Sequence, residues 1–182
     1  MSVIDEVLAA NALYKENHDT SLYSPSPRRK LAVLMCMDTR LTLGALGLDF
    51  GDAHFIRNAG GIATEDAIRS LLVSHYMLGT NEVMVINHTD CGLQKASEEE
   101  MHALIEERAG HPPNFPVRFH AFDDVAQNVY VQLERLASHS WMRKELILRG
   151  FVYDVKTGHL TEVPWACPRT PSIPVLDRRT NR

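Results

Sequence analysis

The sequence lacks the features that mark several broad classes of protein. It has only three cysteines in 182 residues, so a disulfide framework is not indicated. No apolar run approaches the ~20 residues that cross a bilayer, and the N-terminal stretch has no basic segment typical of a signal peptide. The formal net charge of −4 gives no basic surface for nucleic acid or an anionic membrane. We therefore expect a cytoplasmic protein that binds neither.

The sequence also lacks three motifs that mark redox, phosphate-binding and phosphatase proteins. There is no Cys-x-x-Cys redox pair and no glycine-rich phosphate loop. A Cys-x5-Arg phosphatase loop is excluded because Arg40 lies four residues after Cys36. In a reducing compartment, the cysteines are candidates for core packing, metal ligation or reactivity. Cys167 lies in a proline-rich segment and is interpreted as incidental.

Apolar strands and amphipathic helices alternate along most of the chain. Strands are expected at 31–36, 53–57 and 82–88, helices at 65–78, 98–108 and 123–136, a short helical stretch at 42–48, and a hairpin at 150–163 with its turn at Thr157-Gly158. This alternation predicts a single α/β domain with a mainly parallel central sheet, helices on both faces and a C-terminal hairpin.

The two ends of the chain differ from this pattern. Residues Val3 to Tyr14 have the period of an amphipathic helix, and a turn-rich connector follows. We therefore divide the chain into an N-terminal helical arm (1–30), an α/β domain (31–163) and a proline-rich tail (164–182) without periodicity.

Two of the apolar strands end in residues that can bind a metal. Cys36 ends the strand 31–36, and His88 ends the strand 82–88, with Cys91 three residues further on. In an open parallel sheet, ligands bind beyond the carboxyl ends of the strands, where the strand order reverses. Thiolate and imidazole are zinc ligands, and a catalytic site keeps one of its four positions open. From the spacing alone, both a zinc site and ordinary packed core residues remain open.

Asp38 and Arg40 follow Cys36 closely and carry opposite charges. In an extended segment their side chains point to the same side. One interpretation is a surface ion pair that contributes about 0–1 kcal/mol. The other follows from charge: zinc with two thiolates has no net charge left, so a carboxylate that accepts a hydrogen bond from its water would help to deprotonate that water. Arg40 would then keep Asp38 ionised and away from the metal.

Three ordered motifs resemble those of the β-class carbonic anhydrases. They are CMDTR (36–40), RNAGG (57–61) and HTDCG (88–92). The similarity is strongest to short members of that family and covers roughly 31–163. It implies a homodimer or a dimer of dimers, in which the N-terminal helix lies across the partner.

The resemblance also implies a role for each motif residue. Cys36, His88 and Cys91 would bind one zinc ion per chain, and Asp38 and Arg40 would form the catalytic dyad. The residues expected to contact the substrate are Gly92, Arg57, Ala59, Gly60 and Asn87. For Arg57, a structural role on loop carbonyls is an equal alternative.

The implied activity is attack of zinc-bound hydroxide on a small linear heterocumulene. Reversible hydration of carbon dioxide to bicarbonate is the first expectation, because it is the commonest activity of the family. Hydrolysis of carbonyl sulfide is the second, and hydrolysis of carbon disulfide the third. A protein with a structural zinc site or a redox thiol pair, and no enzymatic activity, is the remaining alternative.

Overall fold

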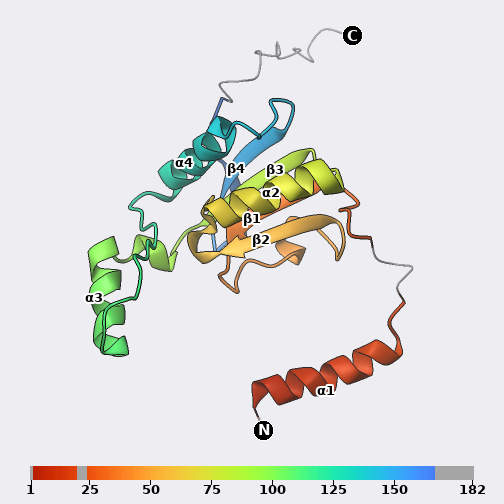
Figure 1. Cartoon of the computed structure of the whole chain (residues 1–182). Helices are drawn as coiled ribbons and strands as arrows, with labels where there is room; N and C mark the ends of the chain where they lie inside the picture. Colours follow the sequence, from red (N-terminus) through yellow and green to blue (C-terminus); the bar gives the residue numbers. More distant parts are fainter. Residues whose placement is uncertain (1, 20–23, 167–182) are drawn as a thin grey trace.

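The computed structural model describes residues 2–19 and 24–166 (Figure 1). Its strands are β1 (Leu31–Cys36), β2 (Ala53–Asn58), β3 (Glu82–His88), β4 (Ile147–Tyr153) and β5 (Leu160–Glu162). Its α-helices are α1 (Val3–Glu16), α2 (Glu65–Leu78), α3 (Glu98–Ala109) and α4 (Val125–Ser138). Three 3₁₀ turns are η2 (Gly44–Leu46), η3 (Ala59–Gly61) and η4 (Gly92–Gln94). Within the described ranges, no helix has the length and apolar character needed to cross a membrane.

The five strands form one sheet in the order β2-β1-β3-β4-β5. The pairs β1–β2, β1–β3 and β3–β4 are parallel, and β5 pairs antiparallel with β4. The expected α/β fold with a mainly parallel sheet and a C-terminal hairpin is confirmed. The first hairpin strand begins earlier than expected, at Ile147, because it also extends the parallel sheet beside β3. The strand order reverses between β1 and β3, which is where a ligand site is expected.

The predicted helices form where the sequence provides caps. Thr64 accepts a hydrogen bond from Ala67 N and begins α2, and Gly79 ends this helix in the left-handed conformation. Ser2 forms a capping box at the start of α1. The stretch expected to be helical at 42–48 contains only the short turn η2, because Gly44 and Gly47 favour a tight turn over a continued helix.

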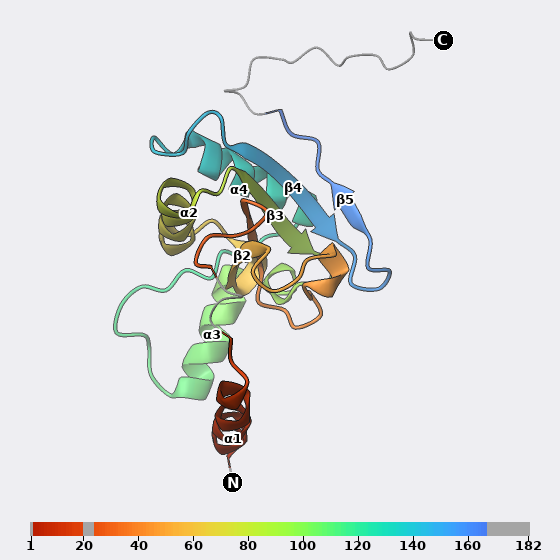
Figure 2. The ribbon, with the colours of Figure 1, turned by 90° about the vertical axis from the view of Figure 1, so that its right-hand side faces the viewer.

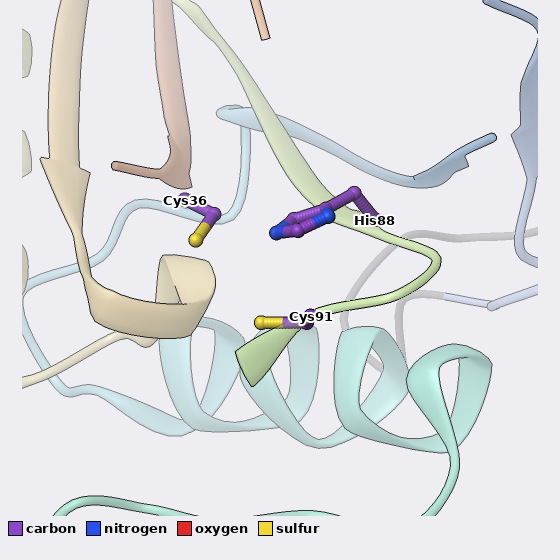
Figure 3. A group of neighbouring side chains, drawn as sticks. All are labelled: Cys36, His88 and Cys91. Atoms are coloured by element: carbon purple, nitrogen blue, oxygen red, sulfur yellow. The ribbon is translucent and has the colours of Figure 1, made fainter. Parts of the chain in front are cut away.

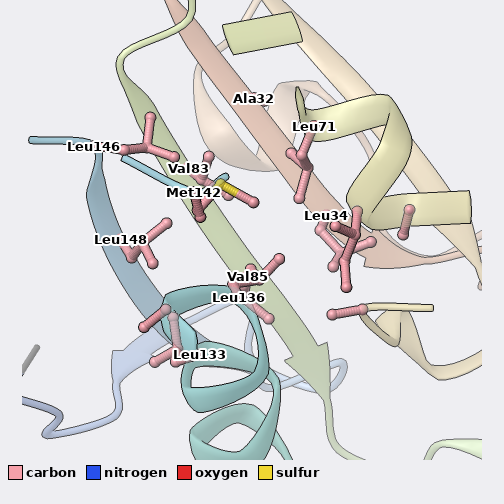
Figure 4. Close-up of a cluster of buried hydrophobic side chains, with 14 of the residues drawn as sticks. Ala32, Leu34, Leu71, Val83, Val85, Leu133, Leu136, Met142, Leu146 and Leu148 are labelled. Carbon is pink, nitrogen blue, oxygen red and sulfur yellow. The ribbon is translucent and has the colours of Figure 1, made fainter. Parts of the chain in front are cut away.

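The main core lies between the sheet and two helices, α2 and α4, which cover the same face (Figures 2 and 4). Leu34 and Val85 from the strands meet Leu71 of α2 and Leu133 of α4 in one cluster, and all four are almost completely buried. The expectation of helices on both faces is therefore wrong for the described residues. The opposite face is covered mainly by segments without regular helix, which contribute Leu41 and Leu48 to a second cluster.

A glycine in β4 lets α4 approach the sheet closely. A Cβ atom at Gly150 would lie 2.7 Å from Leu133 Cδ1 and would also overlap Val129 Cγ1. Both helix residues are fully buried, so neither can move into solvent. The position of α4 over β3 and β4 thus depends on the missing side chain at Gly150.

We expect Gly150→Ala to lower the free energy of unfolding by about 1–3 kcal/mol, since overpacking of a filled core costs about that much. Chemical denaturation followed by circular dichroism measures the change. Gly44→Ala is the matched control, because nothing lies within 4 Å of its added Cβ. Equal stability of the two variants would contradict the proposed contact between Gly150 and α4.

Candidate metal centre

The three predicted ligands meet at the carboxyl ends of β1 and β3. Cys36, His88 and Cys91 are buried, and their ligand atoms all lie within 4.8 Å of one another. Figure 3 shows the two sulfur atoms and the imidazole around one common space. The parallel register brings them together, because Met35 pairs with Ile86, and each strand then delivers its ligand just beyond this pair.

The tautomer of His88 is set by its backbone neighbour. Nδ1 lies 2.8 Å from the carbonyl oxygen of Thr89, which can only accept a hydrogen bond, so Nδ1 carries the proton. Nε2 then has a free lone pair. It is buried and, within the described part of the chain, has no hydrogen-bond partner. A buried acceptor beside two sulfur atoms is otherwise costly, and this donor set fits a zinc ion.

The two thiols act on each other as a close buried pair. A hydrogen bond from Cys91 lowers the pKa of Cys36, although burial opposes this shift. The same hydrogen bond raises the pKa of Cys91, and burial adds to the rise. The amide N–H of Gly60 also donates to Cys36 Sγ, over 3.3 Å. One of the two sulfurs is therefore readily available as a thiolate ligand.

Asp38 and Arg40 form a two-pronged ion pair beside this cluster. Arg40 Nε donates to Asp38 Oδ1 over 2.9 Å, and Arg40 Nη2 donates to Asp38 Oδ2 over 2.8 Å. The backbone N–H of Arg40 also donates to Oδ1. The Arg40 guanidinium thereby holds the pKa of Asp38 well below its usual range. Asp38 Oδ2 lies 3.8 Å from His88 Nε2, so an ionised carboxylate borders the group formed by Cys36, His88 and Cys91.

Two further charged residues beside this ion pair, Asp90 and Lys95, were not identified from the sequence. Arg40 Nη1 donates to Asp90 Oδ2 over 2.8 Å, and Lys95 Nζ lies 2.6 Å from Asp90 Oδ1. The bond from Lys95 has the larger effect on the pKa of Asp90, and together with the bond from Arg40 it lowers this pKa to about 2. Arg40 is thus anchored between two carboxylates. Asp90 is part of the HTDCG motif. Its negative charge, opposite in sign to that of Arg40, was the sequence feature that could have indicated this ion pair.

Arg57 holds the backbone of the CMDTR segment. Its Nε donates to the carbonyl oxygen of Cys36 over 3.1 Å, and its Nη2 donates to that of Asp38 over 2.6 Å. These contacts match the structural alternative for Arg57, in which the guanidinium satisfies loop carbonyls. They fix the chain between a metal-ligand candidate and the carboxylate that borders it.

The remaining predicted substrate residues lie at different places. Ala59 and Gly92 are exposed, whereas Gly60 and Asn87 are buried. Asn87 donates to the carbonyl oxygens of Gly60, over 2.8 Å, and Gly61, over 3.3 Å, and accepts from Asn128. Its amide is thus committed to the loop after β2.

Comparison with known proteins agrees with this arrangement. A family model described as carbonic anhydrase matches residues 31–160. β-Carbonic anhydrase 1 of Mycobacterium tuberculosis is 38% identical over 164 residues, which are 90% of this chain and 99% of that protein. A carbon disulfide hydrolase of Acidithiobacillus thiooxidans is 34% identical in an alignment of 151 positions, which covers 72% of this chain and 76% of that protein.

A solved structure shows the same fold. The crystal structure of a carbonic anhydrase from Streptococcus mutans superposes with a TM-score of 0.83 at 37% identity, covering 90% of this chain and 99% of that chain. The match therefore includes the sheet, α2 and α4, and not only the three motifs. The sequence resemblance is confirmed: the chain belongs to the β-carbonic anhydrase family.

Proposed function

We propose that this protein hydrates carbon dioxide reversibly to bicarbonate at a zinc site formed by Cys36, His88 and Cys91. The observation that carries the proposal is the convergence of these three donors beside an ionised carboxylate, Asp38. Among the described residues, buried His88 Nε2 has no hydrogen-bond partner, so its lone pair can bind a metal. When bound, zinc supplies the Lewis acidity that activates water near neutral pH.

The chain's own residues prepare the water. Asp38 is ionised and can accept a hydrogen bond from a water molecule in the site, which orients that water and favours loss of its other proton. Its two bonds to Arg40 keep the carboxylate at the edge of the cluster. Arg40 cannot follow a movement of Asp38 without breaking its bond to Asp90. The dyad is therefore a fixed acceptor rather than a mobile ligand.

The choice of carbon dioxide rests on the extent of the similarity. The carbonic anhydrase relative is 38% identical and matched over 99% of its length, whereas two carbon disulfide hydrolases are 34% and 31% identical and matched over 76% and 86%. Carbon disulfide, carbonyl sulfide and carbon dioxide are all linear with an electrophilic carbon, so the same donors can serve each of them. Hydrolysis of a sulfur heterocumulene is the second candidate, favoured by the 34% identity to the hydrolase.

We expect kcat/KM for carbon dioxide hydration to exceed that for carbonyl sulfide and for carbon disulfide on one preparation of known zinc content. Stopped-flow pH-indicator assays measure hydration, and sulfide release measures hydrolysis. Cys36→Ser, which removes a metal ligand, gives the background rate for each substrate. Fast sulfide release with slow hydration would replace carbon dioxide as the substrate and leave the site assignment in place.

We expect Arg40→Ala to lower turnover by about 100-fold or more, since it frees the carboxylate that orients the water. Zinc content and fold should stay near those of the unmodified protein, because the guanidinium is partly exposed and an ion pair of this kind contributes only about 0–1 kcal/mol. Metal analysis with steady-state kinetics checks both. Arg28→Ala is the control, because it removes another exposed ion pair, with Asp52, and should leave turnover unchanged. Normal turnover of Arg40→Ala would refute the role of the dyad.

We further propose that the protein is a homodimer or a dimer of dimers, in which α1 lies on the partner. None of the 14 residues of α1 is buried by the part of the chain that the structure describes, and Figure 1 shows this helix apart from the sheet. Its exposed apolar side chains include Val3, Ile4, Val7 and Leu8, which recur at helical spacing. An amphipathic helix that packs on no other described element of its own chain is a natural contact with a second copy.

We expect the double variant Ile4→Asp with Val7→Asp to weaken this assembly, because it places two charges on the apolar side of α1. Sedimentation velocity at micromolar concentration should shift from the dimer or tetramer toward the monomer. Asn11→Asp, an exposed change on the same helix, should not shift it. An unmodified protein that sediments as a fully active monomer would exclude the proposed assembly.

A further inference from the structure

Three buried amide side chains form a continuous hydrogen-bonded chain from α4 to the loop that follows β2. Gln132 and Asn128 lie on α4, and Asn87 lies on β3; their exposed fractions are 4%, 8% and 1%. Gln132 Nε2 donates to Asn128 Oδ1 over 2.9 Å, and Asn128 Nδ2 donates to Asn87 Oδ1 over 2.8 Å. We name these three residues the amide relay. They lie beside an otherwise apolar core, where polar groups persist only with full partners.

Both ends of the amide relay fix the direction of its hydrogen bonds. At one end, the backbone N–H of Ala63 donates to Gln132 Oε1 over 3.0 Å, so the amide NH₂ of Gln132 must face Asn128. At the other end, Asn87 donates to the carbonyl oxygens of Gly60 and Gly61. A backbone N–H can only donate and a carbonyl can only accept. Each amide therefore has a single orientation that satisfies its neighbours.

The amide relay brackets the loop that contacts a candidate metal ligand. The loop from Gly60 to Ala63 is bonded at its start to Asn87 and at its end to Gln132. Gly60 lies in this loop and donates its N–H to Cys36 Sγ over 3.3 Å. The relay thus connects helix α4 to the sulfur of Cys36 through Gly60, whose carbonyl oxygen accepts from Asn87 and whose N–H donates to Cys36 Sγ.

The conformation of this loop leaves two buried carbonyl groups that require hydrogen-bond donors. Gly60 and Gly61 have φ angles of +78° and +65°, in the left-handed region that favours glycine. The turn that directs Gly60 N–H at Cys36 leaves the carbonyls of Gly60 and Gly61 facing buried Asn87. A Cβ at Gly61 would lie 2.8 Å from Asn87 Nδ2 and 3.0 Å from Cys36 N, so the loop has no room to relax. Without a buried donor, both carbonyls would be unsatisfied.

We propose that Asn87, Asn128 and Gln132 are positioning residues that hold the Gly60 N–H on Cys36 Sγ and so tune this sulfur as a metal ligand. The inference rests on the proposed function, in which Cys36 binds zinc. An N–H bonded to a ligand sulfur withdraws electron density from it and fixes its direction. The amide relay therefore acts on the metal through the loop.

The test uses Co²⁺ in place of zinc in the full-length protein, because cobalt bound to a thiolate absorbs through sulfur-to-metal charge transfer. Asn128→Leu keeps the side-chain size and opens the amide relay. Loss of the N–H bond makes the sulfur richer in electrons, so we expect the charge-transfer band to move to longer wavelength. Zinc affinity, measured by competition with a chelator, should fall about tenfold, the usual scale for outer-shell partners of a ligand.

Val129→Ala is the matched control, since it removes apolar volume from the same helix and keeps the three amides. It should lower stability without moving the band. If Asn128→Leu prevents folding, Gln132→Met opens the relay at its outer end and should give the same shift. The proposed role of the amide relay would be refuted in two cases. One is that the opened relay leaves the charge-transfer band and the zinc affinity equal to those of the unmodified protein. The other is that Val129→Ala shifts the band equally. Failure of the unmodified protein to bind either metal would overturn the zinc site, and the inference with it.

Discussion

The parallel pairing of β1 with both of its neighbours is the constraint on which the candidate site depends. In this register Cys36 pairs with Asn58 of β2, while Met35 pairs with Ile86 of β3. The end of β1 is therefore flanked by the loop after β2 and by His88. A shift of one residue would turn each side chain to the other face of the sheet. The three donors converge only in the observed register, so the fold and the candidate metal site are specified together.

The site separates its buried sulfur, imidazole and amide groups from four charged side chains at its rim. The buried ligand candidates and the buried amides are satisfied by one another or by backbone, as far as the described residues show, except at His88 Nε2. The charged groups Asp38, Arg40, Asp90 and Lys95 lie in a row at the edge, with alternating sign. Removing a charge from water is costly, whereas an exposed alternating row costs little. This separation leaves a strong electrostatic influence next to the cluster, while the four charged side chains keep contact with water.

Much of this arrangement could be predicted from the sequence, because the carboxyl ends of parallel strands can be located from their apolar runs and lie at one edge of the sheet. The apolar runs before Cys36 and His88 defined the strands, and the switch-point rule placed the two residues together. The coverage of the second sheet face was predicted wrongly, because the apolar residues of 42–48 were given more weight than Gly44 and Gly47, which favour a turn. The amide relay was also missed: Asn128 and Gln132 lie on a helix, where polar residues usually face solvent, and only the tertiary position of α4 makes them buried.

The position of Asp38 depends on how Arg40 is held. A carboxylate 3.8 Å from His88 Nε2 could itself become a fourth ligand, because oxygen ligands are acceptable to zinc. Two bonds from Arg40 oppose this movement, and they are effective only if Arg40 stays in place. Asp90 supplies the anchor on the far side of the guanidinium, and Lys95 compensates the charge of Asp90. The spacing of Asp38 and Arg40 matters for the same reason, since it lets the backbone N–H of Arg40 add a third bond to the same carboxylate. The local chain, and not only opposite charge, therefore keeps Asp38 available as an acceptor.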